Sequence, residues 1–149
     1  MLKNVKKILV PVDFSDNAPK VFAAAANVAA KFGAELTAVF VVQSFEEYVG
    51  FYVPHMPVMQ FQAEMREGAE KRMADFLEAN LPPGQKGQGK VLEGDVGEEI
   101  VSFAEQEKAD MIVMGTHGYK GLERVLFGSV AEQVVKTATC PVLTVNPCR

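Results

Sequence analysis

Short apolar runs alternate along this chain with longer segments in which apolar residues recur at helical spacing. The short runs are rich in β-branched residues, as is typical of buried strands, and the longer segments are typical of amphipathic helices. The predicted strands are Lys7–Val12, Glu35–Val42, Lys90–Glu93, Met111–Met114 and Pro141–Val145. The predicted helices are Asn17–Phe32, Met59–Leu81, Glu98–Lys108 and Ser129–Ala138.

Strict alternation of strand and helix predicts an α/β fold. With right-handed crossovers, it gives a five-stranded parallel open sheet with helices on both faces, which is a Rossmann-like arrangement. The 149 residues contain no polar linker, so residues 1–149 are predicted to form a single domain. The helical spacing also predicts inward-facing apolar stripes, which include Phe32, Phe61, Met65 and Val135.

Composition and charge exclude several classes of function. Hydrophobic residues make up 48% of the chain, enough for a core, and the net charge of −4 argues against binding to nucleic acid or to an anionic membrane. No apolar run approaches the ~20 residues of a membrane helix, and the first run is too short for a signal peptide. Cys140 and Cys148 fit no disulfide or metal pattern, so we expect reduced thiols in a cytoplasmic protein.

The connection after the fourth predicted strand is punctuated by glycine. Gly115 is followed by Gly118 and by Gly128-Ser129, which gives the spacing G-x2-G-x9-G-[ST] between a strand and a helix. Glycines let backbone N–H groups approach a phosphate, and the free N–H groups at a helix start suit an anion. The connection contains neither GK[ST] nor GxGxxG, so it predicts a phosphate site that is not a Walker A loop.

Asp13 follows the first predicted strand, at the edge of the sheet where open α/β folds bind ligands. A carboxylate there accepts hydrogen bonds from ribose hydroxyls or from an adenine amino group, and it is equally typical of an Asx turn. Its position beside the glycine-rich connection favours a nucleoside contact. Val41, at the end of the second predicted strand, is a further candidate through its backbone, although composition alone assigns it to the core.

Three segments resemble the universal stress protein family. They are KILVPVDFS at the start, GDVGEEI before the third helix, and ADMIVMGTHGYKGLERVLFGSVAEQVVKTATCPVLTV at the end. The resemblance covers nearly the whole chain and implies a five-stranded parallel sheet, similar to the adenine nucleotide alpha hydrolases, in which the first and fourth strands flank the switch point. The family's ATP-binding branch has the motif G-x2-G-x9-G-[ST], and every element of that motif is present here.

This resemblance implies a set of ligand contacts. Adenine and ribose contacts are implied at Pro11, Val12, Asp13 and Val41. Phosphate contacts are implied at Met114, Gly115, Gly118, Gly128, Ser129 and Val130. ATP is the expected cofactor, and Mg²⁺ would arrive with the triphosphate. The last predicted strand, Pro141–Val145, is expected at a sheet edge, where a second copy would pair with it in a homodimer.

Three functions remain open from the sequence. The favoured one is a nucleotide-dependent stress-response or signalling module with a protein partner that the sequence does not name, because the site is rich in backbone donors and poor in catalytic groups. A slow ATPase or ATP-using transferase would use Asp13, Ser15 and His117, although no lysine clamp or second acidic metal ligand accompanies them. A non-catalytic dimeric scaffold would contact its partner through Phe45–Tyr52, within a segment, Phe45–Pro57, whose role the resemblance does not imply.

Overall fold

The computed structural model describes residues 2, 4–44, 55–116 and 129–148. Within these ranges the chain forms one five-stranded sheet in the order β3-β2-β1-β4-β5, with every neighbouring pair parallel. The strands are β1 Lys7–Pro11, β2 Glu35–Gln43, β3 Gly87–Gly94, β4 Met111–Gly115 and β5 Val142–Val145. The strand order reverses between β1 and β4, so the predicted fold class is confirmed, and the switch point lies where the resemblance implied it.

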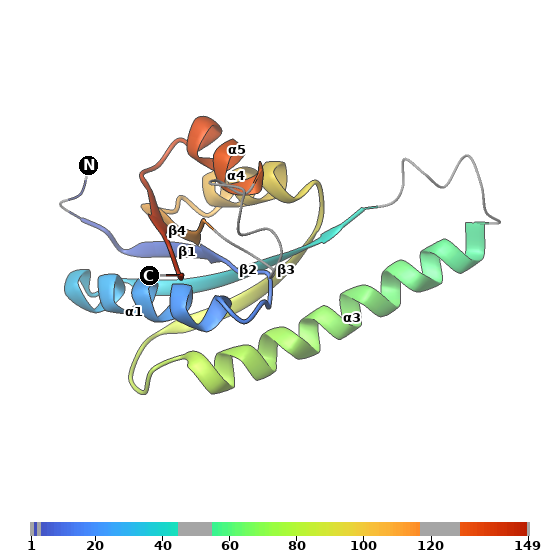
Figure 1. The fold of residues 1–149 in the computed structure, drawn as a ribbon, viewed down its shortest axis with the longest axis horizontal. Coiled ribbons are helices and arrows are strands. Elements are labelled where there is room, and N and C mark those ends of the chain that lie inside the picture. The colour runs from blue at the N-terminus through green and yellow to red at the C-terminus, as the bar shows by residue number, and fades with distance from the viewer. Residues whose placement is uncertain (1, 3, 45–54, 117–128, 149) are drawn as a thin grey trace.

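Helices cover both faces of the sheet (Figure 1). They are α1 Ala18–Phe32, α3 His55–Asn80, α4 Val96–Gln106 and α5 Ser129–Thr137. β1 shows why two layers are needed, since it buries Ile8 and Val10 in the core beneath α1 and α3, and Leu9 in the core beneath α4 and α5. Within the described ranges no helix, α3 included, is both long and apolar enough to cross a membrane.

Local signals fix where two of the helices start and stop. α1 carries a proline in its first turn and ends at Gly33, whose φ of 69° suits glycine and whose N–H donates to the carbonyl of Ala29. α4 starts two residues before the predicted position, because the side chain of Asp95 accepts a hydrogen bond from the Glu98 N–H at 3.1 Å.

β3 starts three residues earlier than predicted, in a glycine-containing stretch whose composition is typical of a turn. Gly87 and Gly89 pair with β2, and a Cβ at Gly89 would overlap with the side chain of Met73 on α3. These glycines therefore belong to the strand and let α3 pack directly against its backbone.

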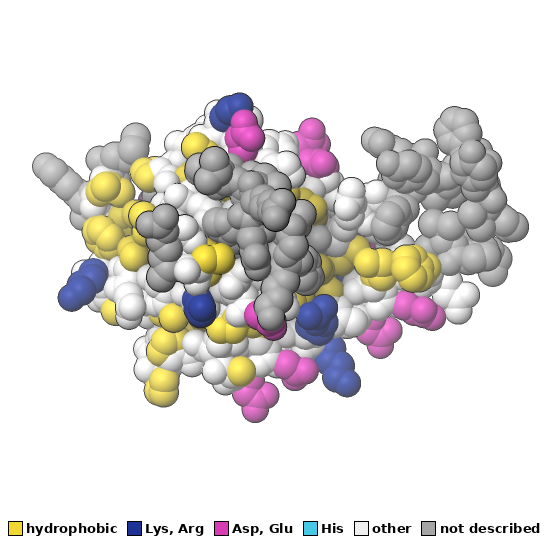
Figure 2. Space-filling view, in the orientation of Figure 1, with side chains coloured by type: hydrophobic (Ala, Val, Ile, Leu, Met, Phe, Trp, Pro, Cys, Tyr) yellow, Lys and Arg dark blue, Asp and Glu magenta, His cyan; other side chains and the backbone are white. Residues whose placement is uncertain are grey.

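Four of the residues predicted to face the core are exposed instead. Phe61 and Met65 are 54% and 38% exposed, because the N-terminal part of α3 extends beyond the sheet (Figure 1). Figure 2 shows hydrophobic side chains at the surface along this part of the helix. Phe32, the last residue of α1, and Val135 on α5 are also exposed, since each lies on a side of its helix that the sheet does not cover.

Candidate functional site

A cavity of about 250 Å³ lies at the carboxyl edge of the sheet, where β1 and β4 are neighbours. Its walls come from the ends of β1, β2 and β4 and from the first turns of α1, α4 and α5. Because α1 lies on one face of the sheet and α4 and α5 lie on the other, the cavity joins the two layers. This is the place where open α/β sheets bind their ligands.

Eight of the ten residues predicted from the sequence line this cavity. They are Pro11, Val12, Asp13, Val41, Met114, Gly115, Ser129 and Val130. The other two, Gly118 and Gly128, lie outside the described residues, as do His117 and the segment Phe45–Tyr52. The fold therefore brings the described candidates together, although they are far apart in sequence.

The cavity walls are largely apolar, and sequence reasoning missed several of their residues. Ala18 and Val21 come from α1, Val96 and Ile100 come from α4, and Ala131 comes from α5. A helix shows the same apolar pattern whether a residue faces the sheet or a cavity, so the pattern alone does not distinguish Ile100 from a core residue. Walls of this kind suit a flat apolar group such as a purine ring, with polar groups needed only at the margin.

The sequence left two interpretations of Asp13 open, an Asx turn and a contact with a nucleoside. The structure shows the Asx turn and also places the residue at the cavity. Its Oδ1 accepts a hydrogen bond from the Ser15 N–H at 2.9 Å, which is an Asx turn. The same residue lines the cavity and is half-buried. The turn therefore holds the carboxylate at the cavity margin rather than competing with a role there.

Ser15, which the sequence associates only with the enzymatic alternative, also lines the cavity. The residue is 7% exposed, and its hydroxyl has no hydrogen-bond partner within the described part of the chain. A buried hydroxyl without a partner is costly, so such groups are rare and mark positions with another role. No sequence signal separates this serine from an ordinary turn serine.

The other polar margin of the cavity is the start of α5. Ser129 is exposed at the first position of this helix, and Ser129, Val130 and Ala131 all line the cavity. The N–H groups of a first helical turn have no intrahelical acceptor, and the helix dipole is positive at that end, so this margin suits an anion. In the same turn, a hydrogen bond from Lys136 lowers the pKa of Glu132, which is exposed.

The remaining candidates for chemistry in the described ranges are the acidic side chains, His55 and the two cysteines. These residues contain no group of three or more His, Cys, Asp and Glu side chains that could hold a metal ion. Cys140 is half-buried, Cys148 is exposed, and both are free thiols. Burial raises the pKa of the Cys140 thiol, which makes it less reactive than an ordinary cysteine near neutral pH.

Residues 4–146 match the Universal stress protein family. A curated relative, universal stress protein MJ0531 of Methanocaldococcus jannaschii, is 43% identical over 146 residues, which is 95% of this chain and 82% of the relative.

Two solved structures show the same fold. The structure of protein MJ0577 from the same organism has a TM-score of 0.77 at 31% identity, covering 96% of both chains. A universal stress protein from Archaeoglobus fulgidus, solved in complex with dAMP, has a TM-score of 0.67 at 24% identity, covering 96% of this chain and 99% of that one. The family match extends over nearly the whole sequence, and this chain therefore belongs to the universal stress protein family.

Proposed function

We propose that this protein binds an adenine nucleotide, ATP, in the cavity between β1 and β4, and that it acts as a nucleotide-dependent module of the stress response. The observation that carries the proposal is the meeting of the eight predicted residues in one cavity at the switch point. A family member of the same fold has been solved with dAMP, which supports an adenine nucleotide as the class of ligand.

The nucleoside would occupy the apolar part of the cavity. Val41 and Ile100 offer aliphatic surface to a purine ring, and the carboxylate of Asp13 offers an acceptor for an amino or hydroxyl group. The cavity volume of about 250 Å³ is close to the lower end of the range for small-molecule sites, about 300 Å³. It therefore suits a nucleoside, with the phosphates placed at the margin.

The phosphates would lie between Gly115 and the start of α5. Gly115 allows close approach to its backbone, and the first turn of α5 offers N–H donors together with the Ser129 hydroxyl. The motif adds Gly118 and Gly128, which lie outside the described residues. Any Mg²⁺ would be held mainly by phosphate oxygens and water.

We infer binding rather than rapid catalysis from the side chains around the cavity. Asp13 is the only charged residue among the described residues that line it. Phosphoryl transfer depends on cations that neutralise the developing charge on the transferred group, and the described lining residues include no lysine or arginine. Hydrolysis at this site is therefore expected to be slow, and a bound nucleotide would act by stabilising one conformation or one complex.

We also propose that the protein forms a homodimer through β5. This strand lies at the edge of the sheet, and Leu143 on it is 40% exposed. An edge strand has backbone N–H and C=O groups available for pairing with another chain. Sedimentation of the purified protein is expected to give twice the mass of one chain, and Leu143→Lys is expected to shift it to a single chain.

The first experiment on the nucleotide is to denature the purified protein and separate the released nucleotides on a column. We expect ATP in the extract. The stripped, refolded protein is then titrated with ATP, with adenosine and with GTP in a calorimeter. Binding of ATP and adenosine with weak or absent binding of GTP supports an adenine site, whereas absence of both co-purified nucleotide and heat of binding would contradict the proposal.

A further inference from the structure

Phe14 lies in the chain between two residues of the cavity wall, but its own side chain is not part of that wall. Asp13 and Ser15 both contribute to the wall, and the hydrogen bond between the Asp13 carboxylate and the Ser15 N–H spans Phe14. Phe14 itself has a φ of 59°. A bulky residue rarely adopts this left-handed conformation, so other contacts must hold the backbone there.

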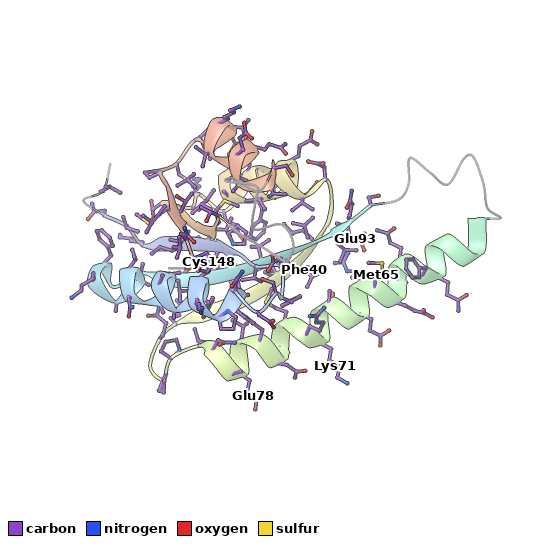
Figure 3. All side chains as sticks on the ribbon, in the orientation of Figure 1. Phe40, Met65, Lys71, Glu78, Glu93 and Cys148 are labelled. Atoms are coloured by element: carbon purple, nitrogen blue, oxygen red, sulfur yellow. The ribbon has the colours of Figure 1, made fainter. Side chains whose placement is uncertain are left out.

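Those contacts come from the ring of Phe14. Its centroid is 4.6 Å from that of Phe40 on β2 and 6.0 Å from that of Phe76 on α3. Cζ of Arg72, also on α3, lies 4.8 Å from the ring centroid. Phe76 in turn packs edge-on against Phe22 on α1, at 5.3 Å. Contacts from β2 and α3 therefore hold the ring, and α1 supports it through Phe76; Figure 3 labels Phe40.

The residues of this turn face two different parts of the protein. The ring of Phe14 packs against the core formed under α1 and α3, while the residues before and after it face the ligand cavity. The Asx hydrogen bond alone is weak support for the unfavourable backbone conformation of Phe14. Aromatic packing supplies the additional support, because a ring held by several neighbours restricts the residue that carries it.

We propose that Phe14 is a positioning residue of the nucleotide site, whose ring holds the turn so that Asp13 is in its binding geometry before the ligand arrives. This inference rests on the proposed nucleotide site. A turn that is already ordered loses little conformational freedom when the ligand binds, and the affinity is correspondingly higher.

The test compares substitutions at Phe14 by calorimetric titration with adenosine and with ATP, at a temperature where each variant is folded. Phe14→Leu removes the aromatic contacts, and we expect both ligands to bind about tenfold more weakly. Phe14→Tyr keeps the ring and is expected to restore both affinities. Phe14→Gly suits the positive φ but has no ring, and we expect it to lose affinity as Phe14→Leu does.

Two further variants separate positioning from general destabilisation. Ile8→Val removes a methyl group from the buried start of β1, at the opposite end of the strand, and should lower the thermal midpoint without changing either affinity. Phe76→Leu acts on the ring from α3 without altering the turn, and should weaken both ligands by a smaller factor than Phe14→Leu.

The outcomes distinguish this inference from the proposed function. If the wild-type protein binds neither ligand, the proposed site itself is wrong. If the wild type binds both and Phe14→Leu or Phe14→Gly binds them equally well, Phe14 has no positioning role. A loss for ATP alone would also overturn the inference, because Asp13 is assigned to the nucleoside.

Discussion

The two margins of the cavity are built in different ways. The turn between β1 and α1 presents side chains, Asp13 and Ser15, and internal contacts of the protein hold it in place. The margin formed by Gly115 and the start of α5 presents mainly backbone, with the Ser129 hydroxyl beside it, so it depends on the absence of a Cβ and on the direction of a helix. Each substitution in the turn should therefore weaken binding only partly. A side chain added at the margin beside α5 should block binding.

The largest effect is expected from Gly128→Val, directly before α5. In the motif this glycine precedes the helix and has no Cβ to keep a phosphate away, so with valine there ATP affinity should fall by about a hundredfold or more. Gly118→Val should act in the same way. Calorimetry measures the loss, and circular dichroism confirms that the domain still folds.

Gly68→Val is the matched control for Gly128→Val. It introduces the same side chain on α3, where an added Cβ would meet no atom within 4 Å. Its ATP affinity should equal that of the wild type. ATP binding by Gly128→Val at wild-type strength would remove the backbone margin from the site.

A smaller effect is expected at the side-chain margin. Asp13→Ala removes both a ligand acceptor and the Asx hydrogen bond, and should weaken ATP and adenosine alike by about tenfold. Asp16→Ala, at an exposed acidic residue of the same turn, is the control and should change neither affinity. A loss for ATP alone would place Asp13 beside the phosphates or a metal ion instead.

Ser129→Ala should have a modest effect confined to the phosphates. The variant loses one hydroxyl donor but keeps the N–H groups of α5, so ATP affinity should fall by about threefold to fivefold, with adenosine unaffected. Ser129→Thr keeps the hydroxyl and should bind like the wild type. An equal loss for adenosine would show that Ser129 contacts the nucleoside.

The smallest effect concerns stability rather than binding. Ser15→Ala removes a buried hydroxyl that has no partner in the described part of the chain, so the ligand-free protein should gain about 1 kcal/mol in its free energy of unfolding. The thermal midpoint should rise by about 2–4 °C. Ser102→Ala is the contrast, because that hydroxyl accepts a hydrogen bond from Gln106, and it should bring no gain.

The fold could be predicted from the sequence because its strands and helices differ clearly in period. β2 and α1 start and end within one residue of the predicted positions. The start of β3 could not be predicted, since glycines such as Gly87 and Gly89 are typical of turns. The close packing of Met73 against Gly89 explains why a glycine is present in the strand. The exposure of Phe61 was also hidden, because the spacing of apolar residues along a helix does not reveal where the sheet beneath it ends.

The candidate site also contains residues that the sequence reveals and residues that it does not. Gly115 and Ser129 belong to a spaced motif, so their contribution was visible in the sequence. Phe14 was not, because its role depends on a backbone angle and on rings from β2 and α3. The contribution of α4 was hidden for another reason, since Ile100 is 1% exposed and has the pattern of any core residue.

The two edges of the sheet differ in a way that bears on how far an assembly of this chain could grow. The strand β5 carries the exposed Leu143, whereas β3 carries glycines and the exposed charges of Lys90 and Glu93. Charged side chains on an edge strand disfavour pairing. Pairing of β5 with β5 about a two-fold axis closes at two chains, whereas pairing of β5 with β3 would leave a free edge at each end and extend into a filament. The charges on β3 are therefore expected to disfavour open-ended polymerisation.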